Sequence, residues 1–126
     1  MTTSRPRGFS LIELLVVMAI IAALVTIALP RYQATVQTAR LTALKENLRV
    51  LRTSLDRHFE DRGTYPESLQ ALVEAKYLKS VPVDPVSESA QSWILMNDPD
   101  GEVEGVVDVR SGAQGMTPDG VPYADL

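Results

Sequence analysis

The chain has 126 residues, 45% of them hydrophobic, and its 12 basic and 16 acidic residues give a formal net charge of −4. This length suits one small domain, and the acidic balance disfavours binding to nucleic-acid phosphates. The absence of cysteine excludes a disulfide framework and a thiol nucleophile. Charge is also uneven, since residues 64–126 carry three basic and eleven acidic side chains. Such a region stays soluble, contacts a basic surface or holds a cation.

The first predicted element is a helix that opens with an apolar run from Phe9 to Leu29, interrupted by one carboxylate at Glu13. About 21 residues at roughly 1.5 Å each are enough to cross a bilayer. Arg5 and Arg7 precede the run, so the N-terminus is expected in the cytoplasm and the remainder outside. A cleaved signal peptide or a plain membrane anchor is the alternative. The length of the run argues against a signal peptide, and a plain anchor would leave Glu13 unexplained.

Beyond the apolar run the sequence predicts that the helix continues as an amphipathic segment over residues 31–62. Pro30 predicts a kink where the chain leaves the membrane. An apolar stripe then follows at spacings of three and four: Leu41, Leu44, Leu48, Leu51, Leu55 and Phe59. Arg52 and Asp56 are expected to pair at i, i+4, His58 is expected on the helix surface, and Gly63 is expected to end the helix. We expect the stripe to hold the remaining domain; a two-stranded coiled coil is the alternative, although the stripe is short for one.

Shorter elements are predicted for the remainder. Tyr65-Pro66 is expected to open a small helix, and residues 81–85 are expected to be extended because they hold two prolines. Residues 92–96 and 102–109 read as strands around a turn at 97–101, the second with Val103, Val107 and Val109 on one face. The tail from Arg110 reads as an irregular loop. The predicted class is therefore α+β: a long kinked helix packed on a small helix, a short antiparallel sheet and an irregular C-terminal loop. No catalytic constellation stands out, so an enzyme is not expected.

The N-terminal segment RGFSLIELLVVMAIIAALVTIALPRY resembles the N-terminus of type IV pilins and of the pseudopilins of type II secretion. The resemblance implies a leader at residues 1–8 that a prepilin peptidase removes by cutting after Gly8, and N-methylation of Phe9 as the new N-terminus. It also implies a transmembrane and filament-core helix at residues 9–30, with Pro30 as its kink. Glu13 would then pair with the Phe9 amine of a neighbouring subunit, which relieves two buried charges.

A second segment, RGTYPESLQALVEAKYLKSVPVDPVS, is similar to the major pseudopilins of type II secretion. The two resemblances imply a pilin-like fold with a periplasmic head at residues 31–126. They further imply a homo-oligomeric helical filament, the pseudopilus, that drives protein export with minor pseudopilins and an inner-membrane platform as partners, and with lipid around the subunit before assembly. A type IV pilin or minor pilin with an adhesive or partner-binding head is the alternative, and an anchored periplasmic binding module that never polymerises is a third possibility.

The resemblance also implies one structural calcium ion in the C-terminal loop. Calcium takes six to eight oxygen ligands, and the tail offers Asp108, Ser111, Asp119 and Asp125. The sequence departs from the family here, because Gln114 stands where an aspartate is usual. The turn at residues 97–101 is acidic as well, but it lacks the spacing of an EF-hand loop.

Overall fold

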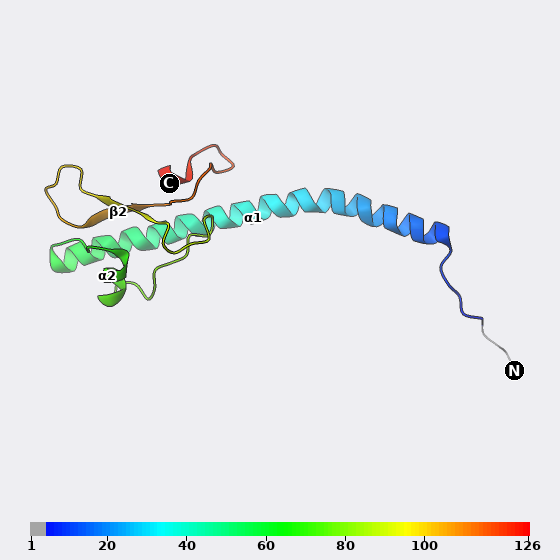
Figure 1. Cartoon of the computed structure of the whole chain (residues 1–126), viewed down its shortest axis with the longest axis horizontal. Helices are drawn as coiled ribbons and strands as arrows, with labels where there is room; N and C mark the ends of the chain where they lie inside the picture. Colours follow the sequence, from blue (N-terminus) through cyan, green and yellow to red (C-terminus); the bar gives the residue numbers. More distant parts are fainter. Residues whose placement is uncertain (1–4) are drawn as a thin grey trace. The chain divides into compact units, whose positions relative to one another are not determined.

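The computed structural model describes residues 5–126; residues 1–4 of the predicted leader lie outside the described part. The contacts divide the chain into two units, one ending at Val36 and one comprising Gln37–Leu126. Helix α1, Leu11–Arg62, belongs in part to each unit and contains Pro30. The predicted α+β, pilin-like class is confirmed, because α1 is followed by a small helix and a two-stranded antiparallel sheet (Figure 1).

The first unit consists of the N-terminal segment and the apolar half of α1. Every side chain from residue 5 to residue 35 is exposed. The most apolar window of α1 has a mean hydropathy of 2.8, and none of it is buried within the chain. A helix that is apolar on all sides and covered by nothing in its own chain needs lipid or other protein around it.

The second unit is built on the leucine stripe of α1. Leu44, Leu48, Leu51 and Leu55 are buried and form one core cluster with Leu69, Leu72, Leu78, Trp93, Val106 and Val109. The stripe therefore packs against the head of its own chain, as predicted. Gly63 ends the helix in a left-handed conformation with φ 72°, and its N–H donates to the Phe59 carbonyl at 2.7 Å.

Two expectations for this part of α1 are wrong. His58 is buried, because its ring packs 5.4 Å from that of Tyr77 and its Nδ1 lies 2.6 Å from the Thr64 carbonyl oxygen. Phe59, placed on the buried stripe by its spacing, is instead 37% exposed and stacks on Tyr65. The chain that folds back after Gly63 covers the histidine side of the helix, which the spacing of leucines could not reveal.

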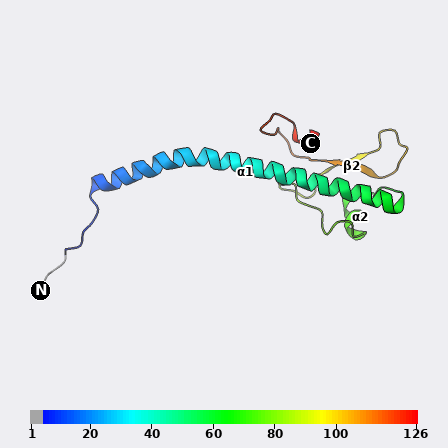
Figure 2. The same cartoon turned by 180° about the vertical axis from the view of Figure 1, so that it is seen from behind.

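The small helix α2, Leu69–Glu74, begins later than the sequence suggested. Pro66 precedes it, and Ser68 is the N-cap, whose Oγ accepts a hydrogen bond from the Ala71 N–H at 3.1 Å. Leu69 and Leu72 face the core. Figures 1 and 2 show α2 and strand β2 along different sides of the C-terminal half of α1.

Strands β1, Ile94–Asn97, and β2, Val106–Arg110, form the antiparallel sheet. Val103, Val107 and Val109 were predicted to share one face of the second strand. Val103 instead precedes the strand, and the buried valines are Val106 and Val109, with Val107 half-buried. Met96 pairs with Asp108 but Asn97 pairs with Val106, so an irregularity shifts the register between them. A bulge of this kind breaks the simple alternation from which the face was predicted.

Candidate functional site

The residues predicted to be processed lie immediately before α1. Gly8 and Phe9 have no regular secondary structure, and Phe9 is 86% exposed. A Cβ added to Gly8 would meet no atom within 4 Å, and Gly8 has no positive φ. The fold of the single chain therefore places no demand for glycine at this position.

Ser10 begins the helix, a role that the sequence reading missed. Its Oγ accepts a hydrogen bond from the Glu13 N–H at 3.2 Å, and its carbonyl oxygen accepts one from the Leu14 N–H at 3.1 Å. The signal was present as Ser-x-x-Glu, the spacing of a capping box. Glu13 consequently lies in the first turn of α1, where the helix dipole favours a negative charge.

Glu13 is surrounded by a large apolar surface. From Phe9 to Leu29, fourteen large hydrophobic side chains are exposed: Phe9, Leu11, Ile12, Leu14, Leu15, Val16, Val17, Met18, Ile20, Ile21, Leu24, Val25, Ile27 and Leu29. Burial of one such side chain contributes roughly 1.5–3 kcal/mol, so covering this surface favours association strongly. In the uncleaved chain the Phe9 nitrogen belongs to a peptide bond, so its pairing with Glu13 of another subunit concerns the mature form and stays a prediction.

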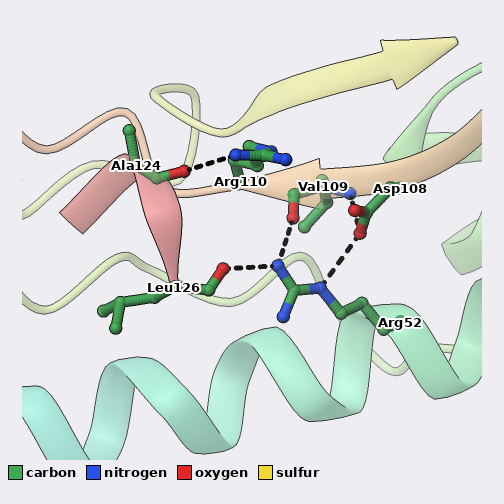
Figure 3. Close-up of polar contacts among 6 residues, drawn as sticks. All are labelled: Arg52, Asp108, Val109, Arg110, Ala124 and Leu126. Carbon is green, nitrogen blue, oxygen red and sulfur yellow. Dashed lines mark hydrogen bonds and ion pairs between the residues drawn. The ribbon is translucent and has the colours of Figure 1, made fainter. Parts of the chain in front are cut away.

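A second group of polar residues joins α1 to the end of the chain (Figure 3). Arg52 donates from Nε to the Asp108 Oδ1 at 3.0 Å, and from one terminal nitrogen to the main-chain oxygens of Val109 at 3.0 Å and Leu126 at 2.6 Å. We call these three contacts the Arg52 clamp. They replace the predicted pair of Arg52 with Asp56, which is exposed on α1.

Arg110 makes a neighbouring connection. It donates from Nη1 to the Ala124 carbonyl oxygen at 3.2 Å (Figure 3). The same nitrogen lies 3.8 Å from the Asp125 Oδ1. These residues belong to β2 and to the 3-10 helix η1, Tyr123–Asp125. Two guanidinium groups thus hold the last residues of the chain against β2 and α1.

The tail is fixed at its start by Asp84 and Ser111, both fully buried. The Ser111 Oγ donates to the Asp84 Oδ2 at 2.5 Å, and the Asp84 Oδ1 accepts from the N–H groups of Val86 at 2.8 Å and Ser87 at 3.2 Å. Sequence reasoning noted Asp84 only as part of a motif. The structure shows it as the acceptor that links the 84–89 turn to the tail.

The four predicted calcium ligands are not gathered into one site. Asp108 contacts Arg52, Ser111 contacts Asp84, Asp125 lies beside Arg110, and Asp119 is exposed. Within residues 5–126 no group of three or more His, Asp or Glu side chains could hold a metal ion. This arrangement does not fit a calcium site, because Asp108 and Asp125 each already lie beside an arginine. Calcium binding itself stays a prediction.

Surface carboxylates elsewhere are held by local contacts. The Arg49 side chain hydrogen-bonds Glu46 and lowers the pKa of that carboxyl group. The Asp100 backbone N–H, followed by those of Val103 and Glu102, lowers the pKa of Asp98 from 3.8. The acidic 97–101 segment is therefore a turn closed by its own aspartate, as its sequence predicted.

Comparison with known proteins supports the interpretation of the N-terminal segment. Residues 3–29 match the family described as "Prokaryotic N-terminal methylation motif". This match and the α+β fold built on an apolar N-terminal helix define a protein of the type IV pilin-like class.

Curated relatives narrow the class. The chain is 30% identical to "Type II secretion system core protein G" of Pseudomonas aeruginosa over 101 residues, which cover 68% of this chain and 71% of the relative. It is also 30% identical to the protein of the same name from Klebsiella pneumoniae, over 96% of this chain and 91% of the relative. "Fimbrial protein EcpC" of Eikenella corrodens is 34% identical over 82 residues, 61% of this chain and 54% of that protein. No solved structure gives a significant match.

The chain belongs to the family of type II secretion system core protein G. It is a type II secretion pseudopilin, as the two sequence segments predicted, and the family consists of structural proteins rather than enzymes. The long apolar helix and the methylation motif suit anchoring in the inner membrane before filament formation.

Proposed function

We propose that this protein is the structural subunit of a periplasmic pseudopilus that drives protein export by a type II secretion system. The observation that carries the proposal is the apolar half of α1, which is wholly exposed in a single chain and bears one carboxylate in its first turn. Such a surface is stable in lipid before assembly and among the helices of other subunits afterwards.

Processing prepares the subunit for this role. Before cleavage Arg5 and Arg7 hold the N-terminus on the cytoplasmic side, and the head lies in the periplasm. A prepilin peptidase cuts after Gly8, which removes both arginines and leaves a positive amine at the start of α1. The peptidase then methylates that amine on Phe9. The leader therefore acts as a topology signal. Its removal converts the Phe9 nitrogen from a neutral peptide group to a positively charged amine.

Glu13 then determines how subunits align in the filament. Its carboxylate pairs with the Phe9 amine of a neighbour inside an apolar core, where an unpaired charge is costly. Loss of one partner of a buried pair costs about 3–5 kcal/mol, which corresponds to more than a hundredfold in an association constant. The inner-membrane platform and the minor pseudopilins are the remaining partners of this assembly step.

The proposal is tested by Glu13→Ala, with Glu60→Ala as the matched control, because Glu60 is an exposed glutamate of the same helix outside the apolar run. Mass spectrometry of the mature chain should show cleavage after Gly8 and one added methyl group in both variants. Filaments collected by shearing or immunogold microscopy should be lost for Glu13→Ala and retained for Glu60→Ala. Normal filaments from Glu13→Ala, or an active wild-type protein that keeps residues 1–8, would contradict the mechanism.

The similarity to a fimbrial protein supports a second candidate, a type IV pilin or minor pilin. The two functions differ in their machinery. Neighbouring genes for a secretin and a secretion motor, together with loss of exported protein on deletion, favour the pseudopilus. A retraction motor, surface pili and loss of adhesion on deletion favour the pilin.

A further inference from the structure

We infer that the guanidinium of Arg52, and not a bound divalent cation, orders the C-terminal tail (residues 111–126) of this protein. The inference goes beyond the proposed function, since it concerns how one subunit holds its own tail and does not depend on filament assembly. It predicts a head whose folding is insensitive to calcium and sensitive to one arginine of α1.

The first argument is geometric. The Arg52 clamp brings three acceptors from distant parts of the chain onto one positive group: a carboxylate at residue 108, a carbonyl at 109 and a main-chain oxygen at 126. A carboxylate with main-chain oxygens around one positive charge is the kind of donor set that a structural calcium ion would gather. Here a planar guanidinium with several fixed N–H donors gathers it instead (Figure 3).

The second argument is charge. Asp108 and Asp125 are the predicted calcium ligands closest to this region, and each lies within 4 Å of an arginine nitrogen, at 3.0 Å from Arg52 and 3.8 Å from Arg110. Each of these carboxylates therefore already has a guanidinium group beside it. A divalent cation placed on Asp108 would lie beside a positive charge that already uses the same oxygen, so its binding is opposed.

The third argument concerns the remaining ligands. The Ser111 hydroxyl is fully buried and donates its proton to Asp84, so its position is set by a carboxylate that the calcium prediction did not include. Gln114, which stands in place of an acidic residue, is exposed. The tail is therefore held at its start by Asp84 and at its end by the Arg52 clamp. The predicted calcium ligands at these two places do not surround a common position.

The inference is tested on the full mature chain in detergent, by unfolding followed through the fluorescence of Trp93, the one tryptophan of the chain, and by hydrogen–deuterium exchange of residues 111–126. Wild type is measured in excess EDTA and in excess calcium. Arg52→Ala is compared with Arg49→Ala, a matched control, because Arg49 lies on the same helix and hydrogen-bonds Glu46 on the helix surface.

We expect wild type to give the same Tm and the same tail exchange in EDTA and in calcium. Arg52→Ala should lower Tm by roughly 5–10 °C and accelerate tail exchange by roughly tenfold or more, whereas Arg49→Ala should change neither. Arg52→Lys should lose part of the protection, because an ammonium group cannot span three acceptors as the guanidinium does.

Two results would overturn the inference. The first is a wild-type Tm that falls in EDTA and is restored by calcium; the second is an Arg52→Ala chain whose tail exchanges as slowly as that of wild type. If Arg52→Ala fails to fold, the inference is still tested by the wild-type Tm in EDTA and in calcium, and by the tail exchange of Arg52→Lys. Loss of filaments in the Glu13 variant has no bearing on these measurements, so the two proposals fail separately.

Discussion

Replacement of Asp84 by alanine tests how the tail is attached to the rest of the head. The carboxylate is fully buried and accepts three hydrogen bonds, from the Ser111 hydroxyl and from the N–H groups of Val86 and Ser87. A hydrogen bond to a charged group contributes about 1.5–3 kcal/mol. Because the turn N–H groups can regain water whereas the buried Ser111 hydroxyl cannot, we expect the free energy of unfolding to fall by roughly 3–6 kcal/mol.

This loss is large for a domain of this size. The unit Gln37–Leu126 has 90 residues, for which a stability of roughly 5–13 kcal/mol is usual. The Tm of Asp84→Ala should therefore fall by more than about 12 °C. Trp93 reports the change well, since it is buried and its Nε1 donates to the Pro82 carbonyl oxygen at 2.8 Å, two residues before Asp84.

Two further variants separate the contacts of Asp84 from a general effect of removing charge. Asp84→Asn keeps an acceptor for the turn and should cost only about 1–2 kcal/mol. Asp100→Ala removes an exposed aspartate and should leave Tm nearly unchanged. A Tm for Asp84→Ala within about 4 °C of wild type would refute the reasoning, because the buried hydroxyl would then have found another partner without cost.

Two more predictions concern backbone geometry and pH. Gly112→Ala should destabilise the head by about 2–3 kcal/mol in thermal melts, because its Cβ would overlap the Ser92 carbonyl oxygen. Gly120→Ala, which meets no atom within 4 Å but has φ 83°, should cost only about 1 kcal/mol; equal losses would show that the close approach is unimportant. The lowered pKa of Asp98 means that its contribution to the turn is present above its ordinary value of 3.8 and is lost as pH falls through the lower folded value. NMR titration should show the turn amides shifting together below pH 3.8, and Asp98→Asn should abolish that step; amides that shift well above this pH would contradict the assignment.

Local features of the sequence were sufficient for much of α1. The apolar run, the leucine spacing and Gly63 predicted the helix and its end, because hydropathy, periodicity and a left-handed glycine act over a few residues. The Ser10 cap is also encoded locally, as a serine three residues before Glu13.

Errors occurred where a partner lies far away in the chain. Spacing paired Arg52 with Asp56, four residues on, but in the structure Arg52 contacts Asp108 across 56 positions. His58 read as a surface residue because the chain that covers it begins only after Gly63. The valines of β2 that enter the core were not predicted, because a shift in register near Met96 cannot be read from the alternation of a single strand.

The sequence alone determined that this protein has an apolar helix with one acidic residue near its start, a processing motif before it and a small α+β head after it, since each is written in neighbouring residues. Only the tertiary structure decided which groups hold the head closed. Asp84 with Ser111, and Arg52 with Asp108, are pairs of common polar residues whose members lie 27 and 56 positions apart. Their significance depends on burial and hydrogen-bond geometry that exist only once the chain has folded.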